Sequence, residues 1–440
     1  MPTSQIKQAA VGTLRAHPAN TRTHSKKQIA QIARSIRQFG FTAPIIIDEN
    51  NVILAGHGRW LAARQLELSN VPVVVLSGLG DAERRAYLLA DNKLVENAGW
   101  DRGALAVELT ELAPLLADAG LDIELTGFGP AEIDALMGDL IDPEQDPADE
   151  LPVIGGTPIS RRGDLWQLGE HHLLCGDARE ASDVAKLMGG QSAAMVITDP
   201  PYNVAISSIQ GRGKIKHRDF VAASGELSES EFTRFLVAAL SLAAKHSVNG
   251  AIHFVFMGWT GLREILTAGA EVYGQPKNLI VWVKTNAGQG TFYRSQHELI
   301  FVFKNGAAAH QNNFELGQYG RTRSNVWTYA GVNTFRTGRL ADLAAHPTVK
   351  PVALVADAMR DCSRRGDIVL DPFMGSGTTI LAAERVGRHG YGLELDPVYV
   401  DVAVRRWQAY TKRDAFLAGT STTFDEVTSA RSSSKCGSGK

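Results

Sequence analysis

Two consecutive prolines directly after an apolar run place the tightest constraint on the fold of this chain. Residues 194–197, Ala-Met-Val-Ile, predict a buried parallel strand that ends near Asp199. Pro200 and Pro201 exclude a helix at this point and lack two N–H donors, so backbone carbonyls project without partners. Because open α/β sheets bind ligands at the carboxyl ends of their strands, we expect a ligand site at this turn.

The same turn carries the groups needed to hold an exocyclic amino group. Asp199 offers a carboxylate, Pro200 a fixed carbonyl and Tyr202 an aromatic face. An amine that donates its two N–H bonds to the carboxylate and the carbonyl is pushed toward tetrahedral geometry, which frees its lone pair. The alternative is an ordinary proline-rich turn. The predicted catalytic residues are Asp199, Pro200, Pro201 and Tyr202.

A second strand-to-helix turn occurs at residues 371–379. The strand 368–370 leads into a turn in which Gly375 and Gly377 allow the backbone to approach a ligand closely. The next strand, 391–393, ends in Glu394, an acid placed to accept hydrogen bonds from ribose hydroxyls. A dinucleotide site fits less well because the third glycine of its fingerprint is missing.

From about residue 160 to 412 the chain resembles the beta group of amino DNA methyltransferases, which use S-adenosylmethionine. The catalytic motif precedes the cofactor motif, as in that group. The resemblance implies an α/β, Rossmann-like sheet of seven mostly parallel strands, with one antiparallel strand and a circularly permuted motif order. The motifs that carry it, in order, are 176–177, 198–203, 282–284 with 297–298, 346–351, 373–378, and Glu394 with Pro397 and Tyr399.

The resemblance also implies which residues hold the cofactor. Glu394 would bind its ribose and Asp177 its adenine, while the segment 346–351 would close over its methionine end. No metal site is expected. The implied cofactor-binding residues are Asp177, Asp371, Phe373, Gly375, Ser376, Gly377, Thr378, Glu394, His346, Thr348 and Lys350.

The target base is predicted from Asp199. No Pro-Cys pair occurs in the chain, so the covalent cysteine route to 5-methylcytosine is excluded. Within the family, Asp at the first motif position favours the N6 amine of adenine, and cytosine N4 is the alternative. A second alternative is a ParB-type DNA-binding regulator in which the methyltransferase fold is a passive scaffold.

The N-terminal region, residues 1–138, resembles the α+β ParB-like domain related to the sulfiredoxin fold. The resemblance rests on residues 24–28, 35–41, 53–59, 71–73 and 90–93. Residues 1–47 contain seven Lys or Arg and no Asp or Glu, which suits contact with DNA. In partition ParB proteins the glycine-rich turn binds a nucleotide phosphate, so a nucleotide is a candidate ligand at Gly56–Arg59. Here that turn lacks the glutamate of the ParB pattern.

Two basic segments predict contacts with double-stranded DNA. Residues 203–225 interleave cations with glycine, as expected for a loop that orders on phosphates. Residues 306–342 alternate arginines with aromatics and form the expected target-recognition segment. The alternatives are a solvated loop and aromatics that only pack on the sheet. The predicted DNA-binding residues are Arg212, Lys214, Lys216, Arg218, Arg321, Arg323, Arg336 and Arg339.

Composition shifts divide the rest of the chain. The acidic stretch 139–156 predicts a linker, residues 157–415 form the expected methyltransferase domain, and the Ser/Thr-rich tail 416–440 is expected to be disordered. Three scattered cysteines and no long apolar run indicate a reducing cytoplasm and no membrane span. A prophage or restriction-modification setting fits the domain fusion. The sequence leaves a homodimer open.

Overall fold

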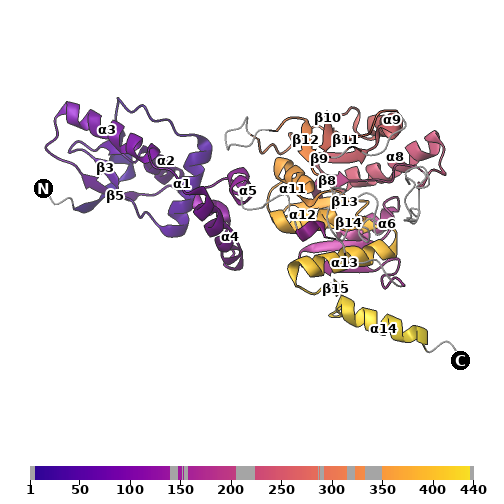
Figure 1. The fold of residues 1–440 in the computed structure, drawn as a ribbon. Coiled ribbons are helices and arrows are strands. Elements are labelled where there is room, and N and C mark those ends of the chain that lie inside the picture. Colours follow the sequence, from indigo (N-terminus) through magenta and orange to yellow (C-terminus); the bar gives the residue numbers. More distant parts are fainter. Residues whose placement is uncertain are drawn as a thin grey trace. The chain divides into compact units, whose positions relative to one another are not determined.

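The computed structural model divides the chain into two compact units, Met1–Leu140 and Ile141–Lys440. Figure 1 shows the helices and strands of both, and each unit is described by itself. Among the described residues, no helix is long and apolar enough to cross a membrane. The structure describes residues 5–138, 147–150, 152, 157–204, 223–285, 287, 292–314, 323–331 and 349–436.

The first unit is built on a five-stranded mixed sheet. Its strand order is β1-β5-β3-β4-β2, with bounds β1 Ile6–Ala10, β2 Arg15–Ala16, β3 Ile45–Ile47, β4 Val52–Ala55 and β5 Asn70–Val75. Helix α1 (Lys26–Phe39) begins at Ser25, whose hydroxyl accepts a hydrogen bond from the N–H of Gln28. Helix α2 (His57–Gln65) follows β4 directly, as the glycine-rich turn predicts.

Three further helices complete the first unit. They are α3 (Asp81–Glu96), α4 (Arg102–Asp118) and α5 (Pro130–Gly138). Helix α4 runs through Pro114, where the sequence predicts a break or a kink. Helices α4 and α5 pack together through a small separate core, which consists of Ala106, Leu109, Ile133 and Leu136.

The second unit contains a ten-stranded sheet with the order β12-β10-β11-β9-β8-β13-β14-β7-β6-β15. In its central seven strands, from β10 to β7, only β11 runs antiparallel, as the resemblance implies. The additional strands lie at the two edges. The bounds are β6 Leu165–Leu168, β7 His171–Cys175, β8 Ala193–Thr198, β9 Ser247–Met257, β10 Asn278–Lys284, β11 His297–Lys304, β12 Val326–Tyr329, β13 Ile368–Asp371, β14 His389–Glu394 and β15 Phe416–Leu417.

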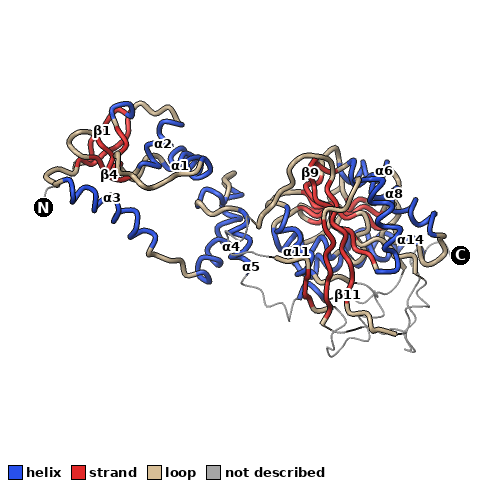
Figure 2. Tube along the Cα trace, turned by 90° about the horizontal axis from the view of Figure 1, so that it is seen from above, coloured by secondary structure: helices blue, strands red, loops and turns tan. Residues whose placement is uncertain are grey.

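Helices cover both faces of this sheet, so the unit has three layers (Figures 1 and 2). Successive residues of β8 point to opposite faces: Met195 and Ile197 pack in one core, and Val196 packs in another. The helices of the first core are α11 (Val352–Cys362), α12 (Thr378–Val386) and α13 (Pro397–Thr411). Those of the opposite face are α6 (Ala181–Met188), α8 (Glu229–Lys245) and α9 (Leu262–Tyr273).

Residues 416–436 form a strand and a helix, in contrast to the disorder expected for 416–440; residues 437–440 lie outside the described residues. Strand β15 pairs with β6, and helix α14 (Phe424–Cys436) follows. Phe424 is buried and lies edge-on against Trp166, while Arg431 forms an ion pair with Asp164. The polar composition hides these contacts because only two apolar residues and one arginine of the helix carry them.

Part of the expected linker belongs to the catalytic unit. Ala148, in the short 3-10 helix Pro147–Asp149, is buried, and its carbonyl accepts hydrogen bonds from Arg406 of α13. The Asp149 carboxylate accepts a hydrogen bond from the N–H of Val352, the first residue of α11. The acidic residue therefore caps a helix that packs on the ten-stranded sheet.

Candidate active site

The predicted catalytic and cofactor-binding acids lie together at the carboxyl ends of neighbouring strands in the second sheet. Strands β8, β13, β14 and β7 are parallel neighbours, so their carboxyl ends lie side by side. Asp199 follows β8, Asp371 ends β13, Glu394 ends β14 and Asp177 follows β7. Four acids that are distant in the sequence are brought to one edge by the strand order, as expected for a doubly wound sheet.

Asp371 joins three elements beneath the turn 372–377. Its Oδ1 accepts hydrogen bonds from the Thr198 hydroxyl (2.8 Å) and the Phe373 N–H (3.1 Å), and its Oδ2 from the Thr379 hydroxyl (2.6 Å). Burial raises the pKa of Asp371 to about 6, although these hydrogen bonds oppose the shift. Through these hydrogen bonds Asp371, at the end of β13, links β8 to α12.

Glu394 holds the same turn from the next strand. Its Oε2 accepts a hydrogen bond from the Gly375 N–H and its Oε1 from the Asp396 N–H, both at 2.8 Å. Burial raises the pKa of Glu394 to about 7. Each carboxylate oxygen can accept a second hydrogen bond, so hydroxyl groups of a ligand can still bind.

Gly377 has a different environment from Gly375. It has φ +87°, and a Cβ atom built on it would lie 2.7 Å from the Cβ of Ala403 in α13. Gly375, with φ +54°, lines the pocket, whereas Gly377 packs behind it. Sequence reasoning assigned both glycines to the cofactor, but Gly377 serves the close approach of α12 and α13.

Arg406, which the sequence did not indicate, supports the turn from below. This α13 residue is 2% exposed, and its Nη1 donates to the hydroxyls of Ser376 and Thr378 and to the Ser376 carbonyl. The two hydroxyls at the glycine-rich turn are therefore engaged with the protein. A lone arginine on an amphipathic helix gives no signal of this role in the sequence.

A pocket opens over this edge and gathers most of the predicted residues. Its mixed lining includes apolar walls from Phe235, Phe373 and Tyr399. Of the predicted catalytic and cofactor residues, those that line the pocket are Asp177, Asp199, Pro200, Pro201, Tyr202, Lys350, Asp371, Phe373, Gly375, Ser376, Thr378 and Glu394.

Asp199 is held by two groups from different parts of the chain. The Tyr202 hydroxyl donates to its Oδ1 (2.8 Å), and the Lys350 ammonium lies 2.6 Å from its Oδ2. Burial raises the pKa of Asp199, while Lys350 opposes the shift. Lys350, expected at the methionine end of the cofactor, lines the pocket and is paired with the Asp199 carboxylate.

Asp177 binds its neighbour Arg179. The Arg179 guanidinium donates to both carboxylate oxygens at 2.9 and 2.6 Å, and its face lies over the Phe235 ring. Although burial acts in the opposite direction, these hydrogen bonds lower the pKa of Asp177. An ionised acceptor therefore lies at the end of the pocket that the resemblance assigns to an adenine.

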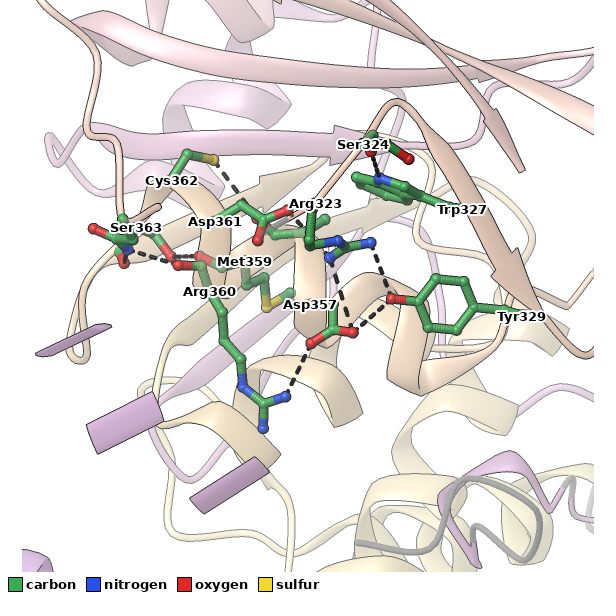
Figure 3. Close-up of polar contacts among 12 residues, drawn as sticks. Arg323, Ser324, Trp327, Tyr329, Asp357, Met359, Arg360, Asp361, Cys362 and Ser363 are labelled. Carbon is green, nitrogen blue, oxygen red and sulfur yellow. Dashed lines mark hydrogen bonds and ion pairs between the residues drawn. The ribbon is translucent and has the colours of Figure 1, made fainter. Parts of the chain in front are cut away.

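Arg323, predicted to contact DNA, is paired within the protein. Figure 3 shows it between Asp357, Asp361 and Tyr329; it pairs with Asp361 at 3.2 Å and lies 4.0 Å from the centre of the Trp327 ring. Its side chain is only 13% exposed. The arginine ties the segment before β12 to helix α11, and its charge is neutralised by acids four residues apart on that helix.

The other predicted DNA contacts and part of the cofactor segment lie outside the described residues. These are Arg212, Lys214, Lys216, Arg218, Arg321, Arg336, Arg339, His346 and Thr348. The described part of the chain adds a candidate that sequence reasoning missed. Phe292 and Tyr293, 84% and 83% exposed, form an edge-to-face pair on the connection between β10 and β11. The sequence pattern that could have indicated this exposed pair is two adjacent aromatic residues in a glycine-containing loop.

The pocket residues fit S-adenosylmethionine. Glu394 and Asp177 supply carboxylate acceptors for ribose hydroxyls and a base amine, and Phe373 and Tyr399 supply apolar walls. The left-handed Gly375 brings the backbone close without a side chain. When bound, the cofactor supplies an electrophilic methyl group.

Three family models match the chain. The DNA methylase model (N6_N4_Mtase) matches residues 193–405, the ParB N-terminal domain model residues 1–93, and the ParB-methyltransferase HTH domain model residues 103–162. The last spans α4, α5 and the stretch expected to be a linker.

Curated relatives match each part. The chain is 54% identical over 66 residues to the ParB-like nuclease domain-containing protein YnaK of Escherichia coli, covering 15% of this chain and 76% of YnaK. It is 28% identical to the type II methyltransferase M2.DpnII of Streptococcus pneumoniae, covering 50% of this chain and 85% of that protein. It is 26% identical to M.HpaI of Haemophilus parainfluenzae, covering 54% and 74%.

Solved structures are also similar at low identity. Crystalline M1.HpyAVI in its S-adenosylmethionine complex is 20% identical, with 53% of this chain and 98% of that chain covered and a TM-score of 0.37. The cytosine-N4-specific PvuII DNA methyltransferase is 17% identical, with 63% and 94% covered and a TM-score of 0.41.

The family matches and the pocket agree on a DNA methyltransferase that uses S-adenosylmethionine. The chain carries an N6/N4 DNA methylase domain over residues 193–405, preceded in the sequence by a ParB N-terminal domain and a ParB-methyltransferase HTH domain.

Proposed function

We propose that this chain methylates the N6 amine of adenine at specific sites in double-stranded DNA. The observation that carries the proposal is the Asp199 carboxylate at the carboxyl end of β8, one strand away from the glycine-rich turn after β13. A carboxylate accepts an N–H bond from an exocyclic amine. Within the family, aspartate at this position favours adenine N6.

In the proposed mechanism, the target base is extruded from the duplex at a cost of a few kcal/mol. Its amine donates to Asp199 and to the Pro200 carbonyl, and Tyr202 stacks on the ring. The nitrogen–methyl bond forms as the sulfur–methyl bond breaks. The extra proton leaves the nitrogen through Asp199 to water. Holding the reacting atoms about 3–3.5 Å apart supplies much of the rate.

The test is methyl transfer from labelled S-adenosylmethionine to plasmid DNA, followed by mass spectrometry of the nucleosides. N6-methyladenine is expected, and N4-methylcytosine would establish the alternative. Asp199→Ala should abolish transfer while cofactor affinity changes only a few fold, because the carboxylate contacts the base. Calorimetry that finds cofactor binding lost in this variant would contradict the assignment.

We further infer that the Phe292–Tyr293 pair contacts DNA beside the extruded base. Both residues follow β10, whose last residue Lys284 pairs with Glu298, and Glu298 contacts Lys350 and Tyr202 of the pocket. Stacking of an aromatic on a base is worth about 1–3 kcal/mol. Tyr293→Ala should reduce the fluorescence change of 2-aminopurine at the target position. An unchanged signal would remove the pair from the interface.

For the N-terminal region we propose a tethered second DNA contact. The HTH match at 103–162 and the acid-free residues 1–47 support it. A linked second contact raises apparent affinity through effective concentration. Deletion of residues 1–100 should weaken DNA binding without changing the methylated sequence, as methylation mapping would reveal. A changed sequence preference would assign recognition to this region.

A nucleotide phosphate is the proposed ligand of the Gly56–Arg59 turn. Gly56 begins helix α2 with φ +97°, and the Nε atom of Arg59 is buried without a hydrogen-bond partner among the described residues. Arg59→Ala should abolish binding of a fluorescent nucleoside triphosphate to the full-length chain. Nucleotide hydrolysis or DNA nicking lost with Arg59 would indicate a second enzyme instead of a tether. Sedimentation of the same samples tests for a homodimer.

A further inference from the structure

Asp199 belongs to a buried group of charges that extends beyond the catalytic motif. The Lys350 ammonium lies 2.6 Å from Asp199 Oδ2 and 3.2 Å from Glu298 Oε2, and Lys284 pairs with Glu298 Oε1. The side chains of Lys350 and Glu298 are only 7% and 16% exposed. Two carboxylates and two ammonium groups balance in charge, which permits their burial.

Glu298 is the member that joins the group together. It lies on β11, the one antiparallel strand of the central sheet, opposite Trp282 of β10. Although burial alone would raise it, the pKa of Glu298 is held at about 2 by the ammonium groups of Lys350 and Lys284. Glu298 is therefore ionised at neutral pH and fixes Lys350 in place beside Asp199.

The hydroxyl of Tyr202 lies between two acceptors. It is 2.8 Å from Asp199 Oδ1 and 3.3 Å from Glu298 Oε2, and its single proton is donated to one of them at a time. Each oxygen of Asp199 already accepts one hydrogen bond, Oδ1 from Tyr202 and Oδ2 from Lys350. An arriving amine must share one of these oxygens with its present donor or displace that donor.

We propose that Glu298 is a positioning residue for methyl transfer. It keeps Lys350 on Oδ2 of Asp199 and accepts the Tyr202 hydroxyl when the target amine takes Oδ1. The hydroxyl then keeps a hydrogen bond in a buried site, where an unsatisfied one is costly. This inference rests on the role proposed for Asp199 and holds for either target base.

The test is the single-turnover rate of methyl transfer with saturating DNA and S-adenosylmethionine. Glu298→Gln should lower this rate about 10- to 100-fold, as expected for a hydrogen bond to a charged group. The KM for DNA and the Kd for the cofactor should change less than about threefold, because Glu298 touches neither in the ground state. Glu298→Asp keeps the charge and should recover part of the rate.

Glu384→Gln is a matched control for the loss of a buried, paired carboxylate. Glu384 pairs with His171 and Arg413, accepts a hydrogen bond from Trp407, and lies outside the pocket lining. Although burial alone would raise it, the pKa of Glu384 is also held at about 2, by hydrogen bonds and nearby positive charge. This variant should lower the melting temperature and leave the single-turnover rate unchanged. A structural role for Glu298 would give the same pattern.

The pH profile of the single-turnover rate gives a second readout. The groups that face Asp199 are Lys350, Tyr202, Glu298 and Asp371. The negative charge of Glu298 raises the pKa of Asp199. Removal of that charge in Glu298→Gln should therefore move the acidic limb of the profile to lower pH. Glu384→Gln should leave this limb in place.

Two results separate failure of the inference from failure of the catalytic assignment. If Asp199→Asn is inactive but Glu298→Gln has the wild-type rate and pH profile, the inference on Glu298 is wrong. If Asp199→Asn remains active, the catalytic role proposed for Asp199 is wrong, and the inference on Glu298, which rests on it, is wrong as well. If Glu298→Gln does not fold, Glu298→Asp carries the test, and a fully wild-type rate in that folded variant also overturns the inference.

Discussion

Gly377→Ala should separate the folding of the catalytic unit from cofactor binding. The left-handed φ of +87° costs an alanine roughly 1–2 kcal/mol. Its Cβ would also lie 2.7 Å from the Cβ of Ala403, and overpacking of this kind costs about 1–3 kcal/mol. The free energy of unfolding should therefore fall by about 2–5 kcal/mol. At about 2 °C per kcal/mol, the expected loss in Tm is ~4–10 °C.

The matched variant is Gly375→Ala, at the same turn but on the pocket side. Gly375 also has a left-handed conformation, with φ +54°, but it lies in the pocket lining, so the Tm of this variant should fall less. An added methyl group at this position is expected to crowd the pocket, and the Kd for S-adenosylmethionine should rise at least about tenfold. Gly377→Ala should keep near wild-type affinity when it is measured well below its Tm.

Tryptophan fluorescence during thermal unfolding and titration calorimetry at 10 °C provide the two measurements. Most tryptophans of the chain lie in the catalytic unit, so the fluorescence mainly follows that unit. The reasoning is refuted if folded Gly377→Ala loses affinity as Gly375→Ala does, or if the two variants have equal Tm values. Either result would place Gly377 against the cofactor and not against α13.

Three further predictions follow from the same contacts. Because the raised pKa of Glu394 is about 7, cofactor affinity should weaken up to about tenfold per pH unit below 7. The cofactor-free unit binds this proton more tightly than the unfolded chain does, so its stability should fall as pH rises from about 5 to 8. A Glu394→Gln variant should bind the cofactor weakly and without this pH dependence. A fragment starting at 141 should unfold at higher temperature than one starting at 155, since only the longer one keeps Ala148 and Asp149; equal Tm values would show that these contacts contribute nothing. Arg323→Ala should lower the Tm and leave the methylated sequence unchanged, and relaxed specificity in methylation mapping would restore its predicted role as a base-reading residue.

Local patterns were sufficient to predict the strand-to-turn elements of the site, whereas the seven-stranded sheet was an implication of the family resemblance. The run ending at Asp199, the turn at 371–379 and the acid at Glu394 are each defined by neighbouring residues. Strand periodicity and glycine turns depend on short-range sterics, which a sequence displays directly. The apolar runs 279–283 and 299–303 are likewise visible in the sequence, and they pair antiparallel within β10 and β11.

The tertiary structure alone decided which charged side chains meet. Lys350 and Asp199 are 151 residues apart, and the packing of α11 on the sheet beside β8 brings them within 2.6 Å. Arg323 lies in a basic aromatic segment that predicts DNA contact, yet its partners are acids on α11. Helix α14 depends on Phe424 fitting against Trp166. A charge or a ring in the sequence does not specify its partner, because burial and pairing depend on how distant elements pack.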